Sequence, residues 1–289
     1  MDSQFFIGHA SNMEDGTGLT VILAPEGAVG GVSVRGAAPG TRETDLLRPT
    51  NSVQKAHAVV LAGGSAFGLE ACSGVMKYLY EKGYGFKAGS AIVPIVPGAV
   101  IFDLSYKNFA YPNLEMGYRA AKEAGPVKLV SGSIGVGTGA TIGKILGPEF
   151  AGKGGLGMAS LTIGTTYVTA VIGVNAIGDV YKGENKIAGI KHERSVMDLL
   201  LDGAKTVPLA GQNTTIGCIL TNADLSKEQA NKLADIAHDG LALAIRPVHT
   251  MMDGDTLFTL AEGGSEIDFL TLQAACVEAV RQAVVNAVS

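Results

Sequence analysis

An asparagine followed by two threonines opens an apolar run, in the order Asn213-Thr214-Thr215. A β-hydroxyl residue that follows a strained peptide bond can attack the preceding carbonyl and form an ester, and water then releases a new N-terminal residue. Such a threonine carries its nucleophile and its own base, because a free α-amine titrates near a pKa of about 7.7–8.0. The pattern therefore offers Thr214 as a nucleophile and Asn213–Thr214 as a cleavage site. An ordinary polar turn explains the same residues, since Asn and Thr are common in turns.

Two aspartates, Asp253 and Asp255, lie close together in residues 249–256. This Asp-x-Asp pattern is compatible with a metal site, a solvated turn or an acid/base pair. A calcium loop beginning at Asp253 requires a glutamate at its twelfth position, where this chain has Gly264, so that reading fails. Two neighbouring carboxylates raise the pKa of one of them, which suits proton sharing with a hydroxyl nucleophile. The turn remains the alternative, because Asp-Gly is turn chemistry.

Two glycine-rich segments could bind a ligand through their backbone. Residues 63–68 follow a predicted strand and open a predicted helix, which is the context of an anion site, although the Lys-Ser/Thr ending of a phosphate loop is missing. We therefore consider Gly64 and Ser65 candidates for contact with a substrate carboxylate or amide. Residues 135–140 match half of a dinucleotide fingerprint. Structural turns and tight backbone packing are the alternative for both segments.

Metal, cofactor and serine-triad chemistry find little support. The five histidines show no ligand spacing, and the flanks of Ser65 do not form G-x-S-x-G. Cys72, Cys218 and Cys276 also lack metal spacing, and each lies in an apolar run where a buried free thiol is expected. We expect neither a metal nor a cofactor.

Composition limits the possible partners and the compartment. The net charge of -5 and the absence of a basic stripe argue against nucleic-acid binding. Prolines and a glycine interrupt the apolar stretch 91–102, which is too short to span a bilayer. The first residues lack a basic region followed by an apolar one, so we expect a cytoplasmic protein. With 47% hydrophobic and 17% charged residues, the chain can bury a sizeable core.

Short strands alternate with amphipathic helices, and no linker or repeat interrupts residues 1–289, so we expect a single domain. The predicted strands are 21–23, 58–62, 127–130, 167–174, 214–221 and 255–260. The predicted helices are 69–82, 194–204, one from a capping box at Ser226 and Gln229 to about Ala244, and a final one. Ser265 with Asp268 is predicted to cap that final helix. Its predicted apolar face comprises Ile267, Leu270, Ala274, Val277, Val280 and Val284.

Taken in order along nearly the whole chain, these motifs resemble the DmpA-type aminopeptidase family. This family includes the L-aminopeptidase/D-esterases, the β-peptidyl aminopeptidases and the nylon-oligomer (6-aminohexanoate oligomer) hydrolases, and the motifs are most similar to the last. The resemblance is carried by residues 7–10, 35–47, 61–69, 101–104, 135–144, 213–216 and 220–223.

The resemblance implies an α+β fold of the N-terminal nucleophile hydrolase type, a four-layer αββα sandwich, and self-cleavage into an α subunit 1–213 and a β subunit 214–289. Thr214 matches the nucleophile of the family. The aminopeptidase branch has a Ser and a Glu in its later motif, whereas Asp253 and Asp255 are similar to the nylon-oligomer hydrolase. Lys144 and Asn175 match that enzyme's Lys and Asn by local context, and the Asn would donate to the oxyanion.

The implied function is an amide hydrolase that acts through an acyl-enzyme ester. It would cleave linear amides of the 6-aminohexanoate type, or short peptides as an aminopeptidase, and would assemble as a tetramer of αβ units. Two alternatives remain. One is a small-ligand-binding protein of the same fold that has no catalytic activity. The other is an acyltransferase of the ornithine acetyltransferase type, whose cleavage context is Lys-Gly-Thr, whereas Thr214 follows Asn213 here.

Overall fold

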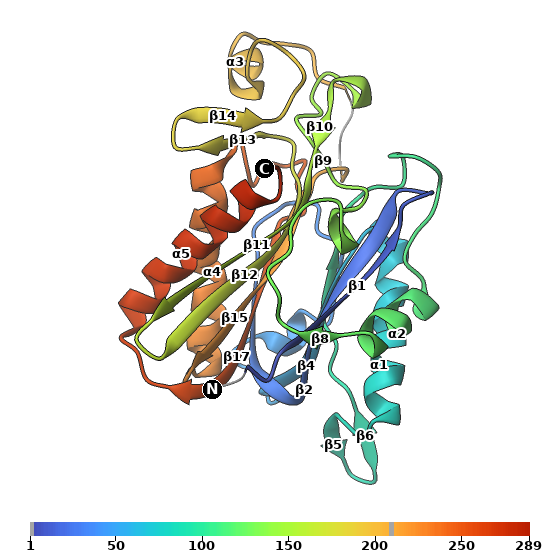
Figure 1. Cartoon of the computed structure of the whole chain (residues 1–289), viewed down its shortest axis with the longest axis vertical. Coiled ribbons are helices and arrows are strands. Elements are labelled where there is room, and N and C mark those ends of the chain that lie inside the picture. The colour runs from blue at the N-terminus through green and yellow to red at the C-terminus, as the bar shows by residue number, and fades with distance from the viewer. Residues whose placement is uncertain (1–2, 208–210) are drawn as a thin grey trace.

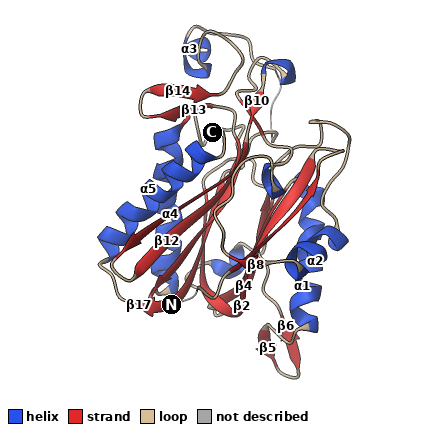
Figure 2. Cartoon of the chain, in the orientation of Figure 1, coloured by secondary structure: helices blue, strands red, loops and turns tan. Residues whose placement is uncertain are grey.

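Two layers of β-strands lie face to face between two pairs of helices (Figures 1 and 2). The computed structural model describes residues 3–207 and 211–289. The strand order within this part of the chain is β11-β12-β15-β17-β2-β4-β7-β3, with β1 paired to β2 and to β8. The first layer contains β11 (Gly155–Ile163), β12 (Thr166–Asn175), β15 (Thr214–Ala223) and β17 (Thr256–Ser265). The second contains β1 (Phe6–Asn12), β4 (Lys55–Ala62), β7 (Gly98–Val100), β3 (Thr41–Arg42) and β8 (Gly125–Pro126).

Strand β2 (Thr17–Val34) belongs to both layers. Its residues 19–23 pair with β4, and its residues 29–34 pair with β17. The register with β4 shifts between Leu23 and Ala28, which marks the bulge where the strand passes from one layer to the other. The two layers are therefore joined covalently as well as packed.

Three hydrophobic clusters fill the spaces between the four layers. Helices α4 (Lys227–Ala244) and α5 (Phe269–Asn286) cover the outer face of the first sheet layer, and α1 (Ala71–Glu81) and α2 (Leu114–Lys122) cover that of the second (Figure 1). The central cluster lies between the sheet layers and includes Ile22, Leu61 and Phe258, all fully buried. This packing is the expected four-layer αββα sandwich.

The remaining elements are short and lie around this sandwich. Near the top of Figure 1 are β9 (Thr141–Ile142), β10 (Gly152–Lys153), β13 (Asp179–Lys182), β14 (Asn185–Ala188) and α3 (Val196–Leu201). At the bottom is the hairpin of β5 (Phe86–Ala88) and β6 (Ala91–Val93). Strand β16 (Ile245–Arg246) pairs with β13. The 3-10 turns are η1 (Asp45–Leu47), η2 (Ser65–Glu70), η3 (Gly135–Gly137) and η4 (Pro148–Phe150). No helix of the described ranges is both long and apolar enough to cross a membrane.

Strand β15 brings the predicted nucleophile into the interior of the molecule. Every residue of the strand is buried, because Ile216, Cys218 and Leu220 alternate into the central cluster while Ile219 faces the helices. The strand lies between antiparallel β12 and parallel β17. Its first residue, Thr214, stands opposite the last residue of β12.

Most of the predicted elements are present. The predicted strands 58–62, 167–174 and 214–221 lie within β4, β12 and β15, and the predicted strand 255–260 matches β17 apart from its first residue. Helix α4 begins with the predicted capping box of Ser226 and Gln229. The predicted strand 21–23 is a part of the much longer β2, and the second predicted helix is shortened to α3. The three cysteines are buried and form no disulfide, as expected.

Three local predictions were wrong. Residues 127–130 form no strand, because their partner β1 begins at Phe6, which already pairs with Pro126. Asp268 alone caps α5 by accepting the backbone N–H of Thr271, whereas Ser265 is bonded within the sheet region. The third, the buried face of α5, was wrong only in part: Val280 and Val284 are buried as predicted, but Leu270 is 72% exposed, and the other buried positions are Leu272, Ala275, Cys276, Ala279, Ala283 and Val285.

The backbones of α5 and β11 approach each other closely. A Cβ on Gly157 of β11 would lie 1.8 Å from the carbonyl oxygen of Ala283 in α5. Such an approach needs small side chains at the contact, and Ala279 and Ala283 are among the residues that α5 buries.

Candidate active site

The Asn213–Thr214 peptide bond is buried at the start of β15, with its attacking group already beside it. The Thr214 hydroxyl donates a hydrogen bond to the carbonyl oxygen of Asn213. The same oxygen accepts the backbone N–H of Gly254 at 2.9 Å. A hydroxyl attack on this carbonyl would place negative charge on that oxygen, so the Gly254 N–H is positioned as an oxyanion donor.

The two aspartates flank Gly254, on the segment that leads into β17. Asp255 is fully buried and accepts the N–H of Thr215 at 2.6 Å, directly after the nucleophile. Asp253 forms a parallel bridge with Asn213 and accepts both the N–H and the hydroxyl of Thr250, at 2.9 and 2.6 Å. Burial, and after it the charge of Asp255, raises the pKa of Asp253 to about 6.

Lys144 and Asn175 meet at the peptide unit before the cleavage site. The Lys144 ammonium donates to the Gln212 carbonyl at 2.9 Å and to the side-chain oxygen of Asn175 at 3.0 Å. The Asn175 amide in turn donates to the Gln212 carbonyl at 3.2 Å and to the Phe102 carbonyl at 3.3 Å. Burial lowers the pKa of Lys144 to about 7, although the charges of Asp253 and Asp103 oppose the shift.

In the intact chain, therefore, the Asn175 amide contacts the carbonyl of residue 212, and the Gly254 N–H contacts that of residue 213. The register of β12 and β15 explains why Asn175 is present here, since it pairs with Thr214 across the two strands. A role for Asn175 in binding a substrate oxyanion remains a prediction.

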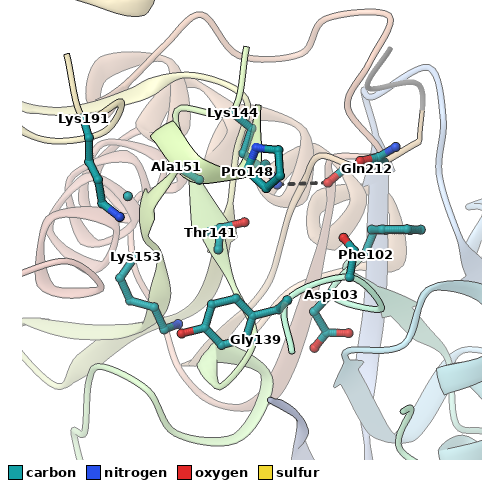
Figure 3. A pocket seen from close by; sticks show the side chains of 13 residues that line it. Phe102, Asp103, Gly139, Thr141, Lys144, Pro148, Ala151, Lys153, Lys191 and Gln212 are labelled. Atoms are coloured by element: carbon teal, nitrogen blue, oxygen red, sulfur yellow. Dashed lines mark hydrogen bonds between the residues drawn. The ribbon is translucent and has the colours of Figure 1, made fainter. Parts of the chain in front are cut away.

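A cavity of about 270 Å³ opens beside this group (Figure 3). Its wall includes Lys144 and Gln212 on the side of the cleavage site, with Asp103, Lys153 and Thr141 around the rest. Lys153 donates to three backbone carbonyls, of Gly137, Ala140 and Gly154, at 2.7, 2.8 and 3.1 Å.

Burial shifts the pKa values of Asp103 and Lys153, both in the wall of the cavity, toward 7. It raises the pKa of Asp103 to about 6 and lowers that of Lys153 to about 8. The cavity thus combines polar groups with pKa values near neutrality beside a buried hydroxyl, an arrangement suited to proton transfer and acyl chemistry.

The structure brings five predicted residues together: Thr214, Asp253, Asp255, Lys144 and Asn175. Gly64 and Ser65 do not line the cavity. The Gly64 N–H is held by Asp103 at 2.6 Å, and the Ser65 N–H by the Ile101 carbonyl at 2.9 Å. The predicted anion position is thus filled by a carboxylate of the chain itself, and a contact of these two residues with substrate remains a prediction.

Sequence reasoning did not assign roles to Gly254, His249 or Asp103. All three lie within stretches that it singled out, because Gly254 separates the aspartates, His249 begins the same segment and Asp103 belongs to residues 101–104. Their contacts depend on tertiary packing. Throughout residues 3–207 and 211–289, no group of three or more His, Cys, Asp or Glu side chains could hold a metal ion.

The sequence profile described as Peptidase family S58 matches residues 5–289. The chain belongs to this family. An uncharacterized aminopeptidase of Mycobacterium leprae is 44% identical over 270 residues, covering 86% of this chain and 72% of that protein. A 6-aminohexanoate-oligomer endohydrolase of an Agromyces species is 34% identical over 277 residues, covering 92% and 74%. The resemblance read from the motifs is confirmed.

Solved structures of S58-like architecture match almost the whole fold. The L-aminopeptidase D-Ala-esterase/amidase of Ochrobactrum anthropi, described as a variant of the Ntn hydrolase fold, superposes with a TM-score of 0.76 at 16% identity, covering 99% of this chain and 84% of that one. A β-aminopeptidase of a Burkholderia species gives 0.70 at 20% identity, with the same coverage. The predicted α+β fold of the N-terminal nucleophile hydrolase type is confirmed.

Proposed function

We propose that this S58 family member is an amide hydrolase that first cleaves its own Asn213–Thr214 bond and then uses Thr214 as an N-terminal nucleophile. The observation that carries the proposal is the Thr214 hydroxyl bonded to the carbonyl oxygen of Asn213, on which the Gly254 N–H also converges. Two donors at one buried carbonyl oxygen favour attack on its carbon.

Self-cleavage would proceed through an ester. The Thr214 oxygen bonds to the Asn213 carbonyl carbon, the C–N bond breaks, and the nitrogen takes up the proton that the hydroxyl loses and leaves as the amine of Thr214. Water then hydrolyses the ester, which releases the carboxylate of Asn213 and restores the hydroxyl. The products are the fragments 1–213 and 214–289.

The mature enzyme would repeat this chemistry on a substrate amide held in the cavity. The new α-amine takes the hydroxyl proton, and Asp253 and Asp255 hold the start of β15 in place. Departure of the Gln212 carbonyl would free the donors of Lys144 and Asn175 for the substrate oxyanion. Linear amides of the 6-aminohexanoate type and short peptides are the substrates we propose, in line with the names of the relatives.

The nucleophile is tested by changing Thr214→Ala and, as a matched control, Thr215→Val. Thr215 is the next residue of β15, is equally inaccessible, and its hydroxyl has no hydrogen-bond partner among the described residues. We expect wild type and Thr215→Val to give the two fragments on a denaturing gel, with a mass matching 214–289. Thr214→Ala should stay intact, and its processing at the wild-type rate would refute the assignment.

A further inference from the structure

His249 makes two hydrogen bonds to the same carboxylate oxygen of Asp255. Its ring Nδ1 lies 2.7 Å from Oδ2, and its backbone N–H donates to the same oxygen at 3.1 Å. A carboxylate only accepts hydrogen bonds, so Nδ1 carries the proton. Both the neutral ring with this tautomer and the imidazolium can make that bond.

The backbone of His249 is held in the left-handed region. Its φ is +58°, a value that is uncommon outside glycine, although Asn, Asp and His adopt it more often than other residues. Such strain persists only where the surroundings fix it, and it tends to occur at functional sites. The contacts that fix this backbone conformation are the two hydrogen bonds to Asp255, because the ring Nδ1 and the backbone N–H must both point toward the same oxygen.

The other edge of the His249 ring is closed off from solvent and polar partners. Its Nε2 is buried and has no hydrogen-bond partner among the described residues. The ring packs against that of His238 on α4, with centroids 4.7 Å apart and planes at 69°. Within the described residues, the ring therefore makes its side-chain hydrogen bond to the Asp255 carboxylate through Nδ1.

The charged and titratable groups around the histidine pair are few. Burial lowers the pKa of His238 to about 4, and its Nε2 bonds to the Ser33 carbonyl at 3.1 Å, so this ring is neutral near pH 7. Arg35, which follows β2, acts on His238 through its charge and is itself paired with Asp235 and Asp239 of α4. On the side of the cleavage site stand Asp255 and, beyond it, Asp253.

Through Asp255, these contacts affect the position of the nucleophile. The second oxygen of Asp255 holds the Thr215 N–H at 2.6 Å, which fixes the strand directly after Thr214. We propose that His249 is a positioning residue, which holds Asp255 and, through it, the Thr215 N–H in place during self-cleavage. This inference rests on the proposed self-cleavage.

Loss of the ring donor should slow self-cleavage while the chain still folds. The Asp255 carboxylate then keeps the backbone N–H groups of His249 and Thr215 but loses the ring, so the strand directly after Thr214 is less firmly placed. A misplacement of about 1 Å can slow a reaction about 100-fold.

Two substitutions separate the effect of the side-chain donor at position 249 from that of the backbone conformation. His249→Gly and His249→Asn both accept a φ of +58°, but only asparagine places an N–H where Nδ1 stands. Full-length chains would be recovered in urea, in which the site cannot form, and diluted into buffers from about pH 4.5 to 8.5. Cleavage would be followed on denaturing gels, with circular dichroism recording refolding.

We expect His249→Asn to cleave at close to the wild-type rate and His249→Gly to cleave up to about 100-fold more slowly. Equal rates for wild type and His249→Gly would overturn the inference, as would an Asn variant that is as slow as the Gly variant. If His249→Gly does not refold, His249→Gln replaces it, and its longer amide should fail to restore the rate. A wild-type chain that stays intact would instead refute the proposed self-cleavage.

Discussion

Lys144 is a lysine buried among oxygen atoms at the centre of the site. Its ammonium has three acceptors, the Gln212 carbonyl and both oxygens of Asn175. Even so, burial lowers its pKa to about 7 from an ordinary value of 10.5, so the folded protein holds this proton less tightly than the unfolded chain. A lysine that is readily neutral can exchange protons near physiological pH.

The lowered pKa predicts how stability changes with pH. Between about pH 7 and 10.5 the unfolded chain binds this proton and the folded one does not, so Lys144 makes stability rise with pH by up to about 1.4 kcal/mol per unit. Below pH 7 the whole penalty for burying the charge is present. In the cleavage-blocked Thr214→Ala background, adding Lys144→Met should flatten the dependence measured by urea unfolding. Lys153, whose effect has the same sign, remains in both proteins. Unchanged slopes would contradict the prediction.

The candidate side chains could be named from the sequence because their chemistry is visible in their types. Spacing made Thr214, Asp253 and Asp255 candidates beside the alternative of ordinary turns, and the resemblance to a family favoured them and added Lys144 and Asn175. The role of Gly254 was not predictable in this way, because it acts through a backbone N–H that every residue except proline has. That of His249 depends on a φ value and a contact that only the fold creates.

At the scale of elements, three segments converge at the cleavage site with no room between their backbones. The segment 253–255 lies between Thr214 and the segment 36–38 that follows β2. The Ala38 N–H donates to the Asp253 carbonyl at 2.9 Å, and a Cβ on Gly36 would lie 2.2 Å from the nitrogen of Asp255. The glycines are thus what lets these segments approach the start of β15.

Adding one methyl group at this convergence should impair cleavage. A Cβ on Gly254 would lie 2.5 Å from the Ala38 carbonyl oxygen and 2.9 Å from the Thr214 hydroxyl. Gly254→Ala must therefore displace the N–H donor or the nucleophile, and a misplacement of about 1 Å can slow a reaction about 100-fold. Gly125→Ala is the control, because its Cβ would meet nothing within 4 Å. Time courses on denaturing gels measure both, and equal rates would be inconsistent with this account.

Elements were predictable where local pattern and tertiary burial agree. Strand β15 and helix α4 satisfy both, since the strand has an apolar centre and is buried throughout, and the helix begins with a capping box. The face of α5 was predicted only in part: Val280 and Val284 are buried, whereas Leu270 is exposed. Periodicity carries no information about which strand the helix will meet, here β11, whose Gly157 lies against Ala283.

Across the whole molecule, the two expected fragments are interleaved. Strands β15 and β17 belong to the C-terminal fragment, yet they lie between β12 and β2 of the N-terminal one. Eight residue pairs join β15 to β12, and six join β17 to β2. Helices α4 and α5 of the C-terminal fragment cover strands of both.

Cleavage should therefore leave a single particle. We expect the fragments 1–213 and 214–289 to elute together in size-exclusion chromatography under native conditions and to separate only in denaturant. Separating them would expose the buried faces of β12 and β15, a loss that breaking one peptide bond does not compensate. Elution of the fragments as separate species in native buffer would disprove this expectation.

The order of strands in the sheet was beyond the reach of local sequence patterns. Periodicity located β12, β15 and β17, but their neighbours and the parallel pairing of β15 with β17 depend on long-range packing. The four-layer arrangement was predicted from the resemblance to a family, which already contains that long-range information. Local pattern alone indicated only strands and helices layered together.

The Gln212 carbonyl, held by Lys144 and Asn175, has a consequence for when activity begins. Before cleavage the chain occupies with its own backbone the donors that a substrate would need. Under the proposed self-cleavage, the newly made protein would be a zymogen inhibited by its own backbone. Because Asn175 of β12 reaches the Gln212 carbonyl when β12 pairs with β15, the enzyme would stay inactive until these strands have come together.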